Sequence, residues 1–541
     1  MKAAHASQDT MDSEHLRKLR TAITENLRVQ RGGAEPVPYI DVGNVLGDVG
    51  TRQNHAIFGR RGCGKSLLLH QSAKHLPEGS RAFYLNCEDF KRHSYPNVLL
   101  EILDALFAEL QKHLTGWFGR KRKLKVLLAD IRLKLATLRV KEDEKISEVR
   151  DTKATETKAG QKCGLTVAGG PIKVEVTEDL FDHDHHETER KYTKHENKIR
   201  ELDVWLPRLK AEIREFFEAS TSVKSVFLQI DDFYHLIRSD QPLVIDYIHR
   251  LCKDVPLYFK VATLRHVSVL YADRGGQPIG AQERHDYQPI NIDFTFADFR
   301  RTVEQNRKIF REFGHLAGMQ PAAIDGIFRG DGFERLVLAG GGVPRDCLSL
   351  FLEVLDAVQE SDGRVGKDDV RILSRANFER RIEELKQDSK DSEQGTLIRG
   401  IYVLRQFCVF ERKTNVVLVS EAVLQQHPRI RALLYRLLDY RIVHSAGTAL
   451  THKSEKGTYH AFVIDIGCYA HMRVLDQRFT EIDLADADAK EKMRSSPILS
   501  EQAFDSLWES APIDSESALR SQESVALDDG TPGTASHTLP T

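Results

Sequence analysis

Apolar residues first recur at helical spacing and then gather in short continuous runs. Residues 13–29 place an apolar residue at every third or fourth position, which predicts an amphipathic helix. Short apolar runs follow, with helical periodicity between them, at residues 56–58, 81–86, 226–232, 257–265 and 289–292. Strands that alternate with helices predict a parallel sheet whose ligand binds at the carboxyl ends of the strands.

A stretch dense in lysine, arginine and glutamate interrupts this alternation. Its apolar positions follow a heptad seam: Leu124, Leu128, Ile131, Leu135 and Leu138. Residues 187–217 are again polar and helical, and residues 165–176 alternate around a Gly-Gly pair, which predicts a β-hairpin. We therefore interpret residues 119–205 as an inserted antiparallel helical arm with a hairpin near its tip. The seam is short, so a coiled coil and a helical hairpin packed on the body fit it equally well.

The C-terminal third predicts helices, then a small helix-and-strand domain, then a tail. Residues 296–360 have helical character. A winged helix is predicted from helices at 397–410, 421–426 and 429–440 and from strands beginning at 441 and 459. The last segment is rich in acidic and small polar residues with little periodicity, so we expect it to be mostly disordered, with a short docking helix near residues 498–508.

These patterns divide the chain into seven segments. They are an N-terminal helix (1–30), the first half of an α/β core (31–118), the arm (119–205), the second half of the core (206–295), a helical lid (296–385), the winged helix (386–475) and an acidic tail (476–541).

Composition and charge restrict the number of domains, the surface charge and the cellular compartment that we expect. A length of 541 residues exceeds one ordinary domain, and a net charge of -2 means that any basic surface must be local. The seven cysteines form no C-x-x-C pair and no secretory segment precedes them, so we expect a reduced, cytoplasmic protein. No apolar run reaches the roughly 18 residues that a membrane span needs.

One motif carries specific chemistry. Residues 59–66 read Gly-Arg-Arg-Gly-Cys-Gly-Lys-Ser between an apolar run and a helical stretch, which is a phosphate-binding loop in its expected context. Its glycines let backbone N–H groups turn toward phosphates, Lys65 would reach the β- and γ-phosphates, and Ser66 would hold Mg²⁺. The alternative is a chance glycine-rich turn. The predicted nucleotide-binding residues are Gly59, Arg60, Arg61, Gly62, Cys63, Gly64, Lys65, Ser66, Leu67, Thr263 and Arg345.

A second set of polar residues follows later strands. Asp231 and Asp232 end a mostly apolar run; Asp231 would bind Mg²⁺, and Asp232 would accept a proton from the attacking water or orient it. Thr263 and Arg265 end the next run, where a γ-phosphate would be sensed. Arg345 opens a helix after a triple glycine and would contact a phosphate. The predicted catalytic residues are Lys65, Asp232, Arg265 and Arg345.

In this order these motifs resemble the AAA+/STAND branch of P-loop ATPases, and look closest to bacterial ATPases of the origin-recognition-complex type. The resemblance covers residues 30–360. It implies an α/β fold with strand order 5-1-4-3-2, a helical lid and bound ATP and Mg²⁺, with Gly59–Ser66 as Walker A and Asp231-Asp232 as Walker B. Thr263 or Arg265 would be sensor 1, and Arg345 sensor 2. Origin-recognition proteins usually carry Asp-Glu, whereas this chain has Asp-Asp, which leans toward STAND ATPases.

The resemblance implies an ATP-hydrolysing switch in replication, transposition or anti-phage defence. Double-stranded DNA is the expected partner of the winged helix, because the domain is locally basic. The predicted nucleic-acid contacts are Arg429, Arg431, Arg436, Lys453 and Lys456. The alternative is a signalling scaffold that recruits an effector through the arm and does not bind DNA. An SMC-like ATPase is disfavoured by the absence of an LSGG signature, and a GTPase by the absence of N-K-x-D.

Two further features stay open. Asp182-His183-Asp184-His185-His186 has metal-ligand side chains, but ligands bunched so closely cannot surround an ion without help, so a solvated turn is the favoured interpretation. Arg300 and Arg301 fall near the expected junction of sheet and lid and are candidates for an arginine finger, which leaves assembly into a homo-oligomer open.

Overall fold

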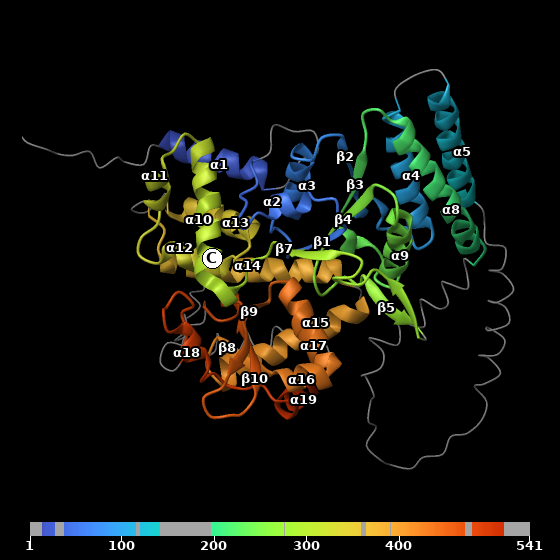
Figure 1. The fold of residues 1–541 in the computed structure, drawn as a ribbon. Coiled ribbons are helices and arrows are strands. Elements are labelled where there is room, and N and C mark those ends of the chain that lie inside the picture. Colours follow the sequence, from blue (N-terminus) through green and yellow to red (C-terminus); the bar gives the residue numbers. More distant parts are fainter. Residues whose placement is uncertain are drawn as a thin grey trace, which may run out of the picture. The chain divides into compact units, whose positions relative to one another are not determined.

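The computed structural model, drawn in Figure 1, describes residues 13–27, 37–114, 119–140, 196–274, 276–358, 364–389, 391–470 and 479–512. Its residues divide into two units. The sheet unit contains residues 43–58 and 68–291. The C-terminal unit contains the described residues of 1–42, 59–67 and 292–541, so the glycine-rich loop groups with the C-terminal half of the chain.

A five-stranded parallel sheet forms the centre of the sheet unit. Its strands are β1 (His55–Phe58), β2 (Ser80–Asn86), β3 (Ser225–Asp231), β4 (Leu257–Thr263) and β7 (Gln288–Asn291), in the order β2-β3-β4-β1-β7. Each neighbouring pair is parallel, as the alternation of apolar runs and helices predicted. The carboxyl ends of all five strands therefore lie on the same side of the sheet, and every residue of the interior strand β3 is buried.

Helices and one short hairpin complete the connections of the sheet unit. The helices are α2 (Val45–Val49), α3 (Lys65–Lys74), whose first turn belongs to the loop, α4 (Asn97–Lys112) and α9 (Gln241–Cys252). The strands β5 (Tyr271–Arg274) and β6 (Gln277–Gly280) form an antiparallel pair that the apolar pattern did not predict. They are too short and too exposed to give a clear alternation.

The two described helices of the predicted arm lie beside α4 (Figure 1). They are α5 (Arg120–Val140) and α8 (Glu196–Ala219). The heptad seam of α5 is buried in the same apolar cluster as the inner face of α4, and Arg132 pairs with Asp104 of α4 at 2.8 Å. Helix α8 continues without a break through the expected domain boundary at residue 205. The predicted hairpin and the Asp182–His186 cluster lie outside the described residues.

The C-terminal unit begins with a helical layer, as its periodicity predicted. Its helices are α1 (Ser13–Asn26), α10 (Phe299–Leu316), α11 (Pro321–Asp325), α12 (Gly332–Ala339), α13 (Pro344–Val358) and α14 (Lys367–Asp388). Phe310 packs edge-to-face on Phe333 and Phe351, with ring centroids 5.3 and 5.1 Å apart. Edge-to-face rings add specific geometry to the apolar burial.

A three-stranded antiparallel sheet follows. Its strands β8 (Val416–Ser420), β9 (Val443–Thr451) and β10 (Thr458–Ile464) lie in the order β8-β10-β9. The helices that accompany it are α15 (Asp391–Arg405), α16 (Glu421–Gln426) and α17 (Pro428–Asp439). The Ser420 hydroxyl accepts from the Val423 N–H at 3.1 Å and caps α16, which begins at the residue that the sequence predicted.

The expected disordered tail is wrong for residues 479–512. This stretch contains α18 (Ala489–Met493) and α19 (Glu501–Ser510). Phe504 and Trp508 of α19 are buried in the core of the C-terminal unit, and their rings stack with centroids 5.6 Å apart. Helix α19 overlaps the docking helix predicted near residues 498–508, and its apolar face stabilises the ordered state.

Candidate functional site

The glycine-rich loop runs directly from the end of β1 into the start of α3. Gly62 and Gly64 have φ angles of +86° and +92°, a region that favours glycine. A Cβ on Gly62 would also lie 2.8 Å from the Cβ of Arg345, so a side chain has no room there. The Arg345 N–H donates to the Gly62 carbonyl at 3.3 Å. The loop and the predicted phosphate-contacting arginine therefore lie together.

Lys65 is the first residue of α3 and is buried. Its ammonium donates to the carbonyl oxygens of Gly59 at 2.8 Å and Arg60 at 3.2 Å, so it lies against the loop's own backbone. The ring of Tyr39 lies 3.6 Å from where a Cβ of Gly64 would stand. Burial raises the pKa of Tyr39, which stays a neutral phenol beside the loop.

Arg60, a variable position of the motif, holds the loop to the residue that follows β7. Its guanidinium donates to both carboxylate oxygens of Asp293, with Nε at 2.6 Å and Nη2 at 2.9 Å. Its backbone N–H also donates to Asp293, at 3.2 Å. Burial alone would raise the pKa of Asp293, but the charge and hydrogen bonds of Arg60 hold it below the usual value. The two-pronged contact fixes both the backbone and the side chain of Arg60.

His444 on β9 joins this contact to the C-terminal sheet. Its Nδ1 lies 3.3 Å from Nη1 of Arg60, and its Nε2 lies 2.9 Å from Oδ2 of Asp465. A guanidinium only donates and a carboxylate only accepts, so the ring must accept at Nδ1 and donate at Nε2. Burial lowers the pKa of His444 to about 4, which agrees with a neutral ring. The neutral Nε2–H tautomer is therefore the form that satisfies both neighbours.

Two buried arginines extend the contact. Arg381 pairs with Asp465 and lies 3.4 Å from Asp346, and Arg441 donates to both oxygens of Asp346 at 2.9 Å. Burial alone would raise the pKa of Asp346, but the charges of Arg441 and Arg381 hold it below its usual value. We call the seven residues the buried charge network: Arg60, Asp293, His444, Asp465, Arg381, Asp346 and Arg441.

The neighbouring loop residue makes a second connection to the same unit. The guanidinium of Arg61 pairs with Asp388 at the end of α14. The carbonyl of Arg61 accepts from Arg441 at 3.4 Å. Consecutive residues of the loop thus contact separate elements of the C-terminal unit, and a change in the loop's backbone would alter both contacts.

The predicted acidic pair lies in the sheet unit. Asp231 ends β3 and is fully buried; it accepts from the Tyr84 hydroxyl at 2.7 Å and from the N–H of Asp232 at 2.9 Å. Asp232 has a φ of 51°, in the left-handed region that residues other than glycine rarely adopt. Since β1 and β3 both run parallel to β4, Asp231 and Phe58, the last residue of β1, lie at the carboxyl ends of the strands.

The two predicted sensor residues of β4 have partners within the sheet unit. The Thr263 hydroxyl bonds to that of Ser268. Arg265 pairs with Glu283 at 2.8 Å and stacks over the Phe58 ring at 4.3 Å. Arg265 is therefore held beside the last residue of β1 with its charge balanced by a carboxylate.

Three of the five predicted nucleic-acid contacts are engaged within the C-terminal unit. Arg429 stacks over Trp508 of α19 at 4.4 Å. Arg436 pairs with Glu393 at 3.0 Å, and Lys453 pairs with Glu491 at 3.1 Å. Arg431 and Lys456 are exposed. The described tail segment thus covers part of the basic face.

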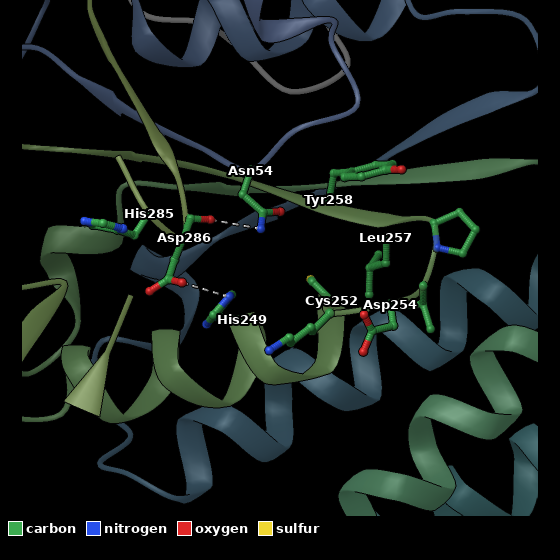
Figure 2. Close-up of a pocket in the computed structure, with 11 residues that line it drawn as sticks. Asn54, His249, Cys252, Asp254, Leu257, Tyr258, His285 and Asp286 are labelled. Carbon is green, nitrogen blue, oxygen red and sulfur yellow. Dashed lines mark hydrogen bonds and ion pairs between the residues drawn. The ribbon is translucent and has the colours of Figure 1, made fainter. Parts of the chain in front are cut away.

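A pocket of about 640 Å³ lies at the amino ends of the strands of the parallel sheet (Figure 2). Asn54, which precedes β1, donates to the Asp286 carbonyl at 3.2 Å, and His249 lies 3.4 Å from the Asp286 carboxylate. Leu257 begins β4 and also lines the pocket. The pocket therefore meets the amino ends of the strands, opposite Asp231, and is separate from the acidic pair.

Across the described ranges, no group of three or more His, Cys, Asp or Glu side chains is arranged to hold a metal ion. Within those same ranges, no helix has the length and apolar character needed to cross a membrane. The six cysteines that they include are buried, free thiols.

Sequence reasoning missed most of the buried charge network. Asp293 could have been found, because it directly follows a predicted strand, and a polar residue at the carboxyl end of a strand is a signal of a functional position. His444, Asp465 and Arg381 carried no such signal, because each contacts a residue far away in the sequence. Arg441 lies in the winged-helix segment that was predicted to be locally basic, but its side chain is 2% exposed.

No family model and no curated protein matches the chain. Among solved structures, it is similar to a Walker-type ATPase of Pyrococcus abyssi, at 12% identity and a TM-score of 0.35, over 87% of this chain and 98% of that one. It is also similar to the Orc1 protein of Aeropyrum pernix, solved in complex with DNA, at 11% identity and a TM-score of 0.29, over 89% and 91%. Neither likeness is high enough to carry an inference about function.

Proposed function

We propose that this chain is an ATP-binding and ATP-hydrolysing switch of the AAA+/STAND type. The observation that carries the proposal is the loop between β1 and α3. It combines two left-handed glycines, a lysine at the first helical residue and an arginine at Gly62. Backbone amides at a helix start, with fixed cations nearby, form an environment suited to phosphates.

The residues present fit ATP and Mg²⁺. The N–H groups of the loop and the ammonium of Lys65 would hold phosphate oxygens, once that ammonium leaves the carbonyls of Gly59 and Arg60. The hydroxyl of Ser66 and the carboxylate of Asp231 are oxygen ligands of the kind that Mg²⁺ prefers. Bound Mg²⁺ would neutralise charge that develops on the phosphates.

Asp232 is the proposed catalytic base. Its carboxylate would take a proton from the attacking water or orient that water, while Asp231 binds the metal. Arg345, whose side chain is one-third exposed, would stabilise negative charge on the transferred group. Thr263 and Arg265 keep their proposed role as sensors at the end of β4.

The buried charge network supports coupling of the loop to the C-terminal sheet. Arg60 of the loop contacts His444 of β9, and His444 contacts Asp465, which follows β10. Movement of Lys65 away from the Arg60 carbonyl would change the hydrogen bonding of the residue that begins this chain of contacts. Nucleotide state and C-terminal structure would then influence each other reciprocally.

The target of the switch is DNA or a protein partner. The order α15, β8, α16, α17, β9, β10 is that of a winged helix, which supports the DNA proposal. The coverage of Arg429 by α19 and the pairing of Lys453 with Glu491 favour the second candidate, a signalling scaffold that does not bind DNA.

The ATPase rate, measured with and without duplex DNA, tests the enzymatic proposal. The parent should hydrolyse ATP, Lys65→Ala should lose nucleotide binding, and Asp232→Ala should bind ATP without hydrolysing it. Hydrolysis by Asp232→Ala at the parental rate would remove Asp232 from the mechanism.

Charge reversal at the two exposed cations decides between the two targets. If DNA is the partner, Arg431→Glu with Lys456→Glu should weaken duplex binding and flatten its dependence on salt. Lys308→Glu, an exposed lysine on α10, is the matched control. Unchanged DNA affinity in the double variant would favour the scaffold.

A further inference from the structure

The outer face of the arm presents an apolar stripe to solvent. Val126, Leu133 and Val140 of α5 are 63%, 67% and 76% exposed. They recur every seven residues, so they lie on one side of the helix. Leu133 is two positions from both Ile131 and Leu135, which are buried, and a shift of two residues places it on the opposite side of α5. The stripe is therefore distinct from the seam that packs on α4.

The neighbouring helix extends this stripe. Helix α8 runs antiparallel to α5: Arg120 pairs with Glu218, whereas Asp130 lies 3.5 Å from Arg208. Continuing this register places Val204, which is 71% exposed, near the level of Leu133. Four of the seven large apolar side chains that are exposed in the described residues thus belong to this pair of helices. Such a concentration marks an interaction surface more often than scattered exposure does.

The charge of α5 defines what kind of partner fits. The helix carries eight lysines and arginines against a single acid, Asp130. Arg120, Arg132, Lys134 and Arg139 pair with carboxylates of α4, α5 and α8. Within the described part of the chain, the side chains of Lys121, Arg122, Lys123 and Lys125 have no ion pair. A partner surface that complements these unpaired cations and the apolar stripe would carry acidic residues beside apolar ones.

We propose that the outer face of α5, together with Val204, is a docking surface for an acidic amphipathic helix of a partner protein. The partner's apolar residues, spaced 3 and 4 apart, would cover Val126, Leu133 and Val140. Its flanking glutamates or aspartates would pair with the four unpaired cations. A second copy of this chain fits less well, because two α5 helices would bring their positive charges together. This proposal does not depend on nucleotide binding.

Fluorescence anisotropy with the full chain and two labelled peptides tests the proposal. One peptide matches the 21 residues of α5 in length and carries leucines at heptad positions flanked by glutamates. The other has the same composition in scrambled order. The heptad peptide should bind, and the scrambled one should bind at least about tenfold more weakly. Equal binding of the two peptides would overturn the proposal, because charge alone would then be recognised.

Two variants assign the binding to this face. Leu133→Glu should weaken heptad-peptide binding at least about tenfold, and Lys121→Glu with Lys123→Glu should weaken it and reduce its salt dependence. Leu133 and Lys123 are exposed and Lys121 is half-buried, and an unchanged thermal melting curve verifies the fold. Ile372→Glu, at a residue of α14 that is 70% exposed, is the matched control and should bind normally. Unaltered binding by Leu133→Glu would contradict the proposal.

Competing occupants give different results. Binding of a DNA duplex that is lost in the lysine double variant but kept in Leu133→Glu, with no heptad-peptide binding, would assign the face to nucleic acid. A dimer in sedimentation velocity that Leu133→Glu dissociates would assign it to a second copy. Either result would overturn the acidic-helix proposal.

Discussion

Both units bury positive charge, and they do so in opposite ways. In the C-terminal unit, Arg60 lies against Asp293, and Arg381 and Arg441 lie against Asp465 and Asp346. In the sheet unit, Lys260 of β4 is fully buried and its nitrogen contacts two carbonyl oxygens and a histidine, each at 2.7 Å. No carboxylate of the described residues pairs with it.

The difference determines which group carries charge. A paired guanidinium stays charged, and removal of its partner leaves an uncompensated charge in the interior. Burial without a counter-ion instead lowers the pKa of Lys260 to about 6 and that of its neighbour His55 to about 3. At pH 7 the neutral amine of Lys260 can donate to the carbonyls of Thr51 and Gln53 and accept from Nδ1–H of His55. The stability of the buried charge network thus depends on its carboxylates, whereas the charge of Lys260 depends on pH.

The largest effect should come from removing an acid from the network. Asp465→Asn removes the negative charge that faces Arg381 and the carboxylate that accepts from His444. It should lower the free energy of unfolding by about 3–5 kcal/mol. Urea denaturation measures it. Asp486→Asn, at an exposed acid, is the control and should lie within about 0.5 kcal/mol of the parent. Equal stability of the two variants would mean that the network does not depend on Asp465.

Replacement of Lys260 should instead change the pH dependence of stability. Its folded pKa lies below its unfolded value of about 10.4, so the unfolded chain binds one more proton between about pH 6 and pH 10. Stability therefore rises with pH through this window, by up to about 1.4 kcal/mol per unit. Lys260→Met should remove this slope, as measured by urea denaturation at several pH values.

Lys253→Met is the control for this comparison, because Lys253 is an exposed lysine on the connection that leads from α9 into β4, the strand of Lys260. The control should keep the parental slope. Below about pH 6.5, His55 adds a separate loss of stability as pH falls toward 3, and Lys260→Met need not preserve it, since Lys260 is the partner of that ring. A parental slope in Lys260→Met between pH 7 and 9 would show that Lys260 is charged in the folded protein.

A smaller effect should follow from replacement of the neutral histidine. His444→Phe leaves Nη1 of Arg60 without its acceptor and removes one of the donors to Asp465, which still accepts from Arg381, and should cost about 1–3 kcal/mol of stability. It should also weaken ATP binding, since Arg60 belongs to the loop. His460→Phe, on β10 of the same sheet and without a contact to the loop among the described residues, should bind ATP as the parent does. Identical ATP affinity in the two variants would contradict coupling through His444.

Local patterns predicted much of the fold and little of the network. The parallel strands, the seam of α5 and the cap of α16 follow from periodicity and from single residues such as Ser420. The loop was found because its glycines, lysine and serine are consecutive. Asp293 and Arg60 are 233 positions apart, and no local rule links them.

Counts of charged residues along the chain did not show which arginines of the C-terminal domain pair with carboxylates. Arg436 was a predicted nucleic-acid contact and Arg441 lies in the segment predicted to be basic, but each is paired with a carboxylate and mostly buried. Similarly, acidic composition led to the expectation of a mostly disordered tail over residues 476–541, whereas α19, which overlaps the predicted docking helix, holds Phe504 and Trp508 in the core. Composition measures charge along the chain, whereas the fold determines which charges remain exposed.

Isothermal titration of Mg²⁺–ATP into the purified chain tests the central claim, that a phosphate-binding loop tied to the C-terminal sheet holds the nucleotide. The account predicts saturable uptake near one nucleotide per chain in the parent and none in Lys65→Ala, with both proteins folded by circular dichroism. No measurable uptake by the folded parent, or unchanged uptake by Lys65→Ala, would contradict it.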